Sequence, residues 1–150
     1  MAPAPIPDQR GLFDQANHFI RRVIDLLEHT VACGEQPDLG AFTTKNHGRE
    51  TVVVETLKDH LIQLRVSSVA LLQLELRYHL EMNSAGDYVR IEKSKFQVFG
   101  MTEGTSPFFR YDFEAHPGSA SIPTAHLNVY GHRDDLLHAM YVSNKSRSRP

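Results

Sequence analysis

The stretch that decides the fold is "ALLQLELRYHLEM", residues 70–82. Leucines, a tyrosine and a methionine occupy every second position, with polar residues between them. Successive side chains of a β-strand point to opposite sides, so a period of two over this length predicts a strand with one buried and one polar face. The polar positions are Gln73, Glu75, Arg77, His79 and Glu81.

The segments around this strand predict further strands joined by short turns. "NSAGD" at 83–87 is typical of a hairpin turn, and it leads into a long strand at 88–100. We expect that strand to be bulged, because its alternation slips near Ser94. Strands are also predicted at 108–115 and 124–131, and upstream at 51–57 and 58–68, whereas the turn-forming residues at 35–50 predict a loop. The order predicts an antiparallel meander.

Two segments have the periodicity of helices. Between residues 8 and 33, apolar residues recur at three- and four-residue spacing, which predicts a long amphipathic helix that packs on the sheet. "RDDLLHAMYV" at 133–142 predicts a short helix with its aspartates in the first turn. The predicted fold class is therefore α+β, with a long N-terminal helix packed on a curved antiparallel β-meander and a short C-terminal helix.

Length and composition indicate one ordinary globular domain. We expect a single domain over residues 1–150, with an extended proline-rich N-terminus at 1–7 and a flexible basic tail at 143–150. The net charge of -2 argues against nucleic-acid binding over the whole surface but allows a local basic patch. The single cysteine excludes an internal disulfide. We expect no membrane contact and a cytoplasmic location, because neither a long apolar run nor a secretory signal is present.

The polar faces of the last strands form the candidate site. Ala125, Leu127 and Val129 share one face, and we expect them to meet the helix and the core. If the strands pair in sequence order, the opposite face gathers polar side chains from three strands. The candidate catalytic residues there are His126, Arg110, Asp112, His79 and Tyr130. The candidate binding residues are Arg77, Asn128, His116 and His132.

These residue types suit acid–base chemistry on a phosphodiester. His126 would move a proton near neutral pH, Arg110 or Arg77 would hold a phosphate, and Tyr130 or Asn128 would orient the imidazole. A ribonuclease that uses no metal needs little more. An ordinary solvated sheet face is the alternative interpretation, because nine histidines in the chain make chance clusters common.

No metal or other cofactor is expected. On one straight strand His126 and His132 would lie about 20 Å apart. Two ligands of one zinc ion must lie within about 4 Å of each other. The run "HLNVYGH" is therefore not a chelating motif by itself.

Two strings, "FFRYDFEAH" (Phe108–His116) and "IPTAHLNVYGH" (Ile122–His132), resemble the TumE-type toxins of bacterial toxin–antitoxin systems. The resemblance implies a toxin that acts on RNA and is neutralised by a cognate antitoxin. This sequence departs from the family's His–His pattern, with single histidines at 116 and 126, and it has a longer N-terminus.

The alternative is a non-catalytic interaction or structural protein of a regulatory or viral assembly. Its sheet edge would then pair with another strand. A homodimer is among the expected partners, because an open meander leaves edges to cover.

Overall fold

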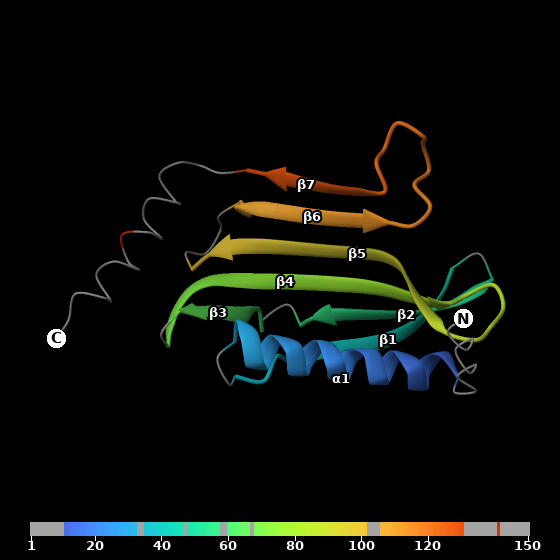
Figure 1. Cartoon of the computed structure of the whole chain (residues 1–150), viewed down its shortest axis with the longest axis horizontal. Helices are drawn as coiled ribbons and strands as arrows, with labels where there is room; N and C mark the ends of the chain where they lie inside the picture. Colours follow the sequence, from blue (N-terminus) through green and yellow to red (C-terminus); the bar gives the residue numbers. More distant parts are fainter. Residues whose placement is uncertain are drawn as a thin grey trace, which may run out of the picture.

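The computed structural model describes residues 11–32, 35–46, 48–57, 60–66, 68–101, 106–130 and 141. Over these ranges it contains one helix and one seven-stranded sheet (Figure 1). The elements are α1 (Leu12–Thr30), β1 (Leu39–Asn46), β2 (Arg49–Thr56), β3 (Ile62–Val66), β4 (Val69–Met82), β5 (Val89–Gly100), β6 (Phe109–Glu114) and β7 (Ala125–Val129).

The sheet is antiparallel throughout, and β4 is its central strand. The strands follow the order β1-β2-β4-β5-β6-β7, and β3 also pairs with β4. The same side of β4 pairs with two strands, β3 along Val69–Leu74 and β2 along Arg77–Leu80. The stretch with the strictest alternation is thus the strand around which the others assemble.

The pairing of β4 with β5 contains the expected bulge. The register shifts between His79 and Leu80, which pair with Lys93 and Ile91, so Glu92 is the extra residue. This irregularity lies two residues before Ser94, where the alternation of the sequence slips. A β-bulge adds one residue to one strand and increases its local twist.

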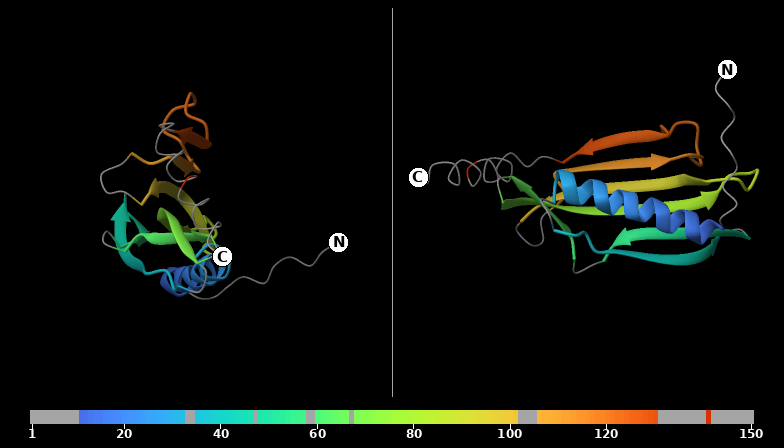
Figure 2. Two further views of the ribbon diagram at one scale, coloured as in Figure 1. Left: turned by 90° about the vertical axis from the view of Figure 1, so that its left-hand side faces the viewer. Right: turned by 60° about the horizontal axis from the view of Figure 1, so that its bottom comes forward.

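The helix covers one face of half of the sheet and forms the core there. It contacts β2, β4 and β5 (Figure 2, right). Ala16 and Ile20 pack with Val52, Val54 and Leu80 in one buried cluster. The far end of the same layer holds a second cluster of buried residues, which comprises Ala32, Ile62, Leu74, Leu76 and Val98. The predicted apolar face of β4 is confirmed as the buried one.

The predicted α+β class is wrong for the part of the chain that the structure describes. Among the described residues α1 is the only helix of more than one residue, and it stands beside a seven-stranded sheet, so this part of the fold is mostly β. Residues 133–142, predicted as the short helix, lie outside the described ranges apart from residue 141, as do residues 1–7 and 143–150. No helix in the described part of the chain is long and apolar enough to cross a membrane.

The loop predicted for residues 35–50 is also wrong, because much of it is β1. Every residue of β1 pairs with β2, from Leu39 opposite Thr56 to Asn46 opposite Arg49. "GAFTTKN" has no clean alternation, and its glycine disfavours a strand. Cross-strand pairing with the valines of β2 overrides this weak local preference, as is common in sheets.

The prediction that the apolar residues of β7 meet the helix and the core is also wrong. Ala125, Leu127 and Val129 do not meet the helix or the core but are all exposed. The alternation of the strand is as predicted, but α1 packs mainly on β2, β4 and β5, and the apolar side chains of β7 stay exposed. The end-on view shows the helix at one end of the sheet and β7 at the other (Figure 2, left).

Candidate functional site

The face of the sheet opposite the helix carries a row of charged residues. Their Cα atoms are paired in register from β2 through β4, β5 and β6 to β7. The row consists of Glu55, Arg77, Lys95, Asp112 and His126. Neighbouring strands are about 4.8 Å apart, so side chains next to each other in this row are within reach of direct contact.

A pocket of about 320 Å³ opens on this row. It brings together five of the predicted site residues, and they come from β4, β6 and β7. They are Arg77, His79, Arg110, Asp112 and His126. Lys93 and Lys95 of β5 line the same pocket, and Ile122 and Pro123 line it from the segment that leads into β7.

His126 meets the carboxylate of Asp112 with one ring nitrogen. Its Nε2 lies 3.5 Å from Asp112 Oδ2, close enough for an ion pair when the ring is protonated but without hydrogen-bond geometry. Arg110 Nε donates a 2.6 Å hydrogen bond to the same oxygen. His126 Nδ1 is buried and has no hydrogen-bond partner among the described residues. The side chain as a whole is 35% exposed, and Nε2 is the ring nitrogen that faces Asp112.

The cations around the pocket differ in how they are neutralised. Arg77 pairs with Glu55, and Lys93 pairs with Glu114, at 2.5 Å each. Lys95 has no ion-pair partner within the described part of the chain. Its ammonium group is therefore the charge most available to an anionic ligand.

The lining as a whole is cationic. Four cationic side chains line the pocket, against the two carboxylates of Asp112 and Glu114. The pKa of His79 is consistent with this excess. It is lowered first by partial burial and then by the positive charges of Arg77 and Lys93. The imidazole of His79 is therefore neutral near pH 7, where it can accept or donate a hydrogen bond but adds no charge.

Arg110 keeps its positive charge over the whole physiological pH range. Its pKa is raised, chiefly by the hydrogen bond to Asp112. The guanidinium is thus held in place by the carboxylate that also faces His126. These three residues form a compact unit on β6 and β7, in which Asp112 positions both the cation and the imidazole.

The structure places the other predicted residues outside this pocket. Asn128 lies opposite Arg110 on β7, and Tyr130 follows β7, so neither lines the pocket next to His126. Asp112 is instead the residue that faces the imidazole of His126. His116 lies after β6 and contacts Glu92 at 2.7 Å. His132 is outside the described residues.

The lysines of β5 were missed by the sequence analysis. Lys93 and Lys95 are two residues apart and so share a face, which is a usable signal. The slip in alternation near Ser94 hid that face. The register settles it, because Lys93 pairs with His79 and Lys95 with Arg77, both on the polar side.

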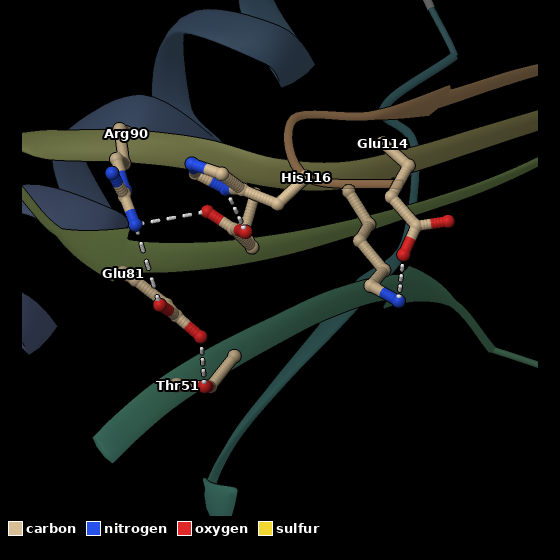
Figure 3. Close-up of polar contacts among 7 residues, drawn as sticks. Thr51, Glu81, Arg90, Glu114 and His116 are labelled. Atoms are coloured by element: carbon tan, nitrogen blue, oxygen red, sulfur yellow. Dashed lines mark hydrogen bonds and ion pairs between the residues drawn. The ribbon is translucent and has the colours of Figure 1, made fainter. Parts of the chain in front are cut away.

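A second polar network, which includes the predicted binding residue His116, lies beside the pocket (Figure 3). Arg90 Nη2 lies 3.1 Å from Glu92 and 3.9 Å from Glu81. Glu81 accepts a hydrogen bond from Thr51 at 2.9 Å, and Glu92 contacts His116. The two glutamate side chains are only 12% and 15% exposed, and the bulge places Glu92 within reach of this network. These contacts link β2, β4 and β5 to the loop after β6 on the polar face of the sheet.

No three His, Cys, Asp or Glu side chains among the described residues gather into a group that could hold a metal ion. Comparison of the chain with protein-family models, with curated proteins and with solved structures finds no significant match.

Proposed function

We propose that the polar face binds RNA and cleaves it by acid–base chemistry at His126 without a metal ion. The observation that carries this proposal is the pocket in which His126, Asp112 and Arg110 stand next to the unpaired ammonium of Lys95. The same face would bind the phosphates of a single RNA strand at the cationic side chains of the pocket. The resemblance of residues 108–116 and 122–132 to TumE-type toxins adds support, and it implies a cognate antitoxin as the partner.

The proposed reaction needs a base, an acid and a cation. His126 Nε2 takes the proton of the ribose 2′-hydroxyl, and the 2′-oxygen forms a bond to the adjacent phosphorus. The bond from phosphorus to the 5′-oxygen breaks, and this oxygen leaves with a proton from Lys95 Nζ. The products are a 2′,3′-cyclic phosphate and a 5′-hydroxyl end. Arg110, held by Asp112, stabilises the charge that develops on the phosphoryl oxygens.

His79 does not serve as the second proton-transfer group in this scheme. It lies on β4, three strands away from His126, which is roughly 14 Å between the strand axes. Lys95 lies on β5, between them, and directly beside the β6 strand that carries Asp112. The lowered pKa of His79 fits a neutral group that hydrogen-bonds the bound strand.

The test uses purified protein and a labelled single-stranded RNA in a buffer that contains a chelator. The wild type should cleave this RNA and leave the all-deoxy version intact, because the deoxy strand has no 2′-hydroxyl. His126→Ala should lower the rate about 10²- to 10⁴-fold, the usual contribution of a general base. His18→Ala, which removes an exposed histidine of α1, is the matched control and should cleave like the wild type.

A substitution of Lys95 tests RNA binding and cleavage separately. Lys95→Arg keeps the positive charge but is a poor proton donor, because an arginine side chain does not lose its proton in proteins. We expect this variant to bind RNA within about twofold of the wild type and to cleave it at least tenfold more slowly. Cleavage of the deoxy strand, or equal rates for wild type and His126→Ala, would contradict the proposal.

Expression of the wild type and of His126→Ala in cells tests whether the protein is a toxin. Induced expression of the wild type in a bacterium should stop growth and deplete RNA, and His126→Ala should relieve both effects. Equal growth of the two strains with folded protein would favour the second candidate, a non-catalytic interaction protein. That candidate draws its support from the exposed apolar side chains of β6 and β7.

A further inference from the structure

The uncovered half of the sheet carries an apolar strip on the face that the helix shares. The strip consists of Phe109 and Tyr111 of β6 and Leu127 and Val129 of β7. Their exposed fractions are 38%, 36%, 59% and 72%. The register places them opposite one another, Phe109 with Val129 and Tyr111 with Leu127, so they form one continuous surface.

The size of the strip is that of an interaction site. A large apolar side chain has roughly 150–250 Å² of surface, so these four leave about 300–400 Å² uncovered. A strip of this size equals the largest apolar patch of a typical monomer, and such patches are often functional. Isolated exposed leucines need no explanation, but four paired residues on two neighbouring strands do.

A groove of about 550 Å³ runs between this strip and α1. Its walls come from the helix and from β4, β5 and β6. All of its lining residues are apolar except Arg90 and Ser94: they are Phe19, Tyr78, Leu80, Val89, Ile91, Phe96, Tyr111 and Phe113. The same surface therefore carries projecting side chains on β7 and a groove that begins at the neighbouring strand β6.

We propose that this face packs against the same face of a second copy of the chain. In a two-fold dimer Leu127 and Val129 of each copy enter the groove of the other. A surface that carries both the projection and the recess is self-complementary, which a two-fold interface requires. The inference rests on the apolar face alone and is independent of the chemistry proposed for the opposite face.

The layer spacing of the fold leaves room for this partner. A helix packs about 10 Å from the layer it covers, and two sheets also pack about 10 Å apart. The partner's β6 and β7 would therefore continue the layer that α1 begins, without a step. The strip supplies about half of the roughly 800 Å² that each partner buries in a standard interface. The flanks of the groove along α1 would supply the rest.

The test is the oligomeric state measured by analytical ultracentrifugation from about 5 to about 200 µM, the range in which interfaces of this size differ in strength. The wild type should be a dimer over most of this range. Phe109→Glu should weaken dimerisation at least tenfold, which is about 1.4 kcal/mol. Phe42→Glu is the matched control, because Phe42 is 45% exposed but lies on β1 at the other edge, opposite Val53 of the polar face. It should remain a dimer.

Circular dichroism and RNA cleavage accompany both variants. A folded Phe109→Glu monomer that still cleaves RNA separates this inference from the proposed function. A wild type that stays monomeric at the highest concentration overturns the inference, and so does a dimer that both variants leave intact.

Discussion

The two halves of the sheet have the same alternation but differ in what covers them. On β4 the apolar residues lie under α1, and Leu76 and Leu80 are 1% and 0% exposed. On β7 the corresponding residues, Leu127 and Val129, are more than half exposed. Alternation therefore reports which side chains share a face, whereas burial depends on an element that can reach that face.

The largest expected contrast is in the free energy of unfolding. Leu80→Ala should cost about 2–5 kcal/mol, because it opens a cavity between α1 and the sheet. Leu127→Ala should change the free energy of unfolding by no more than about 0.5 kcal/mol from the wild-type value. This is measured by urea denaturation at a concentration where the protein is monomeric. Equal losses for the two leucines would show that the face of β7 is buried after all.

The loss of a buried side-chain hydrogen bond should lower the free energy of unfolding by a smaller amount. The Thr56 hydroxyl donates to the Leu76 carbonyl at 3.4 Å and accepts from the Leu76 amide at 3.2 Å, where β2 leaves β4. Thr56→Val keeps the shape and leaves both backbone groups unpaired, so we expect a loss of about 1–3 kcal/mol. Thr43→Val, at an exposed position of β1, should be neutral in the same denaturation experiment.

On the polar face, Asp112→Asn should separate affinity from catalysis. The substitution removes a negative charge from a cationic pocket, so RNA should bind a few-fold more tightly at low salt, as measured by fluorescence anisotropy. Cleavage should fall, because Arg110 and His126 lose the carboxylate that positions them. Asp25→Asn makes the same change in net charge at an exposed position of α1, so it should alter neither RNA affinity nor the cleavage rate. Weaker RNA binding by Asp112→Asn would contradict the assigned pocket.

The smallest expected effect is a pH dependence of stability. The pKa of His79 is lower in the folded protein than in the unfolded chain, so the unfolded chain takes up this proton first as the pH falls below about 6.5. Stability present at pH 7 is thus partly lost toward pH 5, and His79→Gln should flatten that decline.

His29 acts in the opposite direction. Its pKa is raised, chiefly by the hydrogen bond to the Asp25 carbonyl. Its contribution to stability is therefore present below about pH 6.5 and is lost at higher pH. His29→Gln should make the decline toward pH 5 steeper. Chemical denaturation at pH 7 and pH 5 checks both variants, and a shift of the same sign in both would be inconsistent with these environments.

Much of the candidate site was predictable from alternation. Arg77, His79, Arg110, Asp112 and His126 were placed on one face, and the pocket brings them together. Lys93 and Lys95 were not found, because the bulge at Glu92 breaks the pattern that would have oriented them. The slip near Ser94 indicates a bulge, but only the register shows which residue is the extra one and which face the two lysines share.

The sequence by itself determined the long amphipathic helix, the central strand, the hairpins that follow it and the separation of each strand into two faces. These features depend on local periodicity and turn chemistry, which act over a few residues. Only the tertiary structure decided that β1 pairs with β2, that β2 and β3 share one side of β4, and that α1 packs mainly on β2, β4 and β5. Those outcomes depend on contacts between residues far apart in the chain, and they determine which apolar face is core and which is open surface.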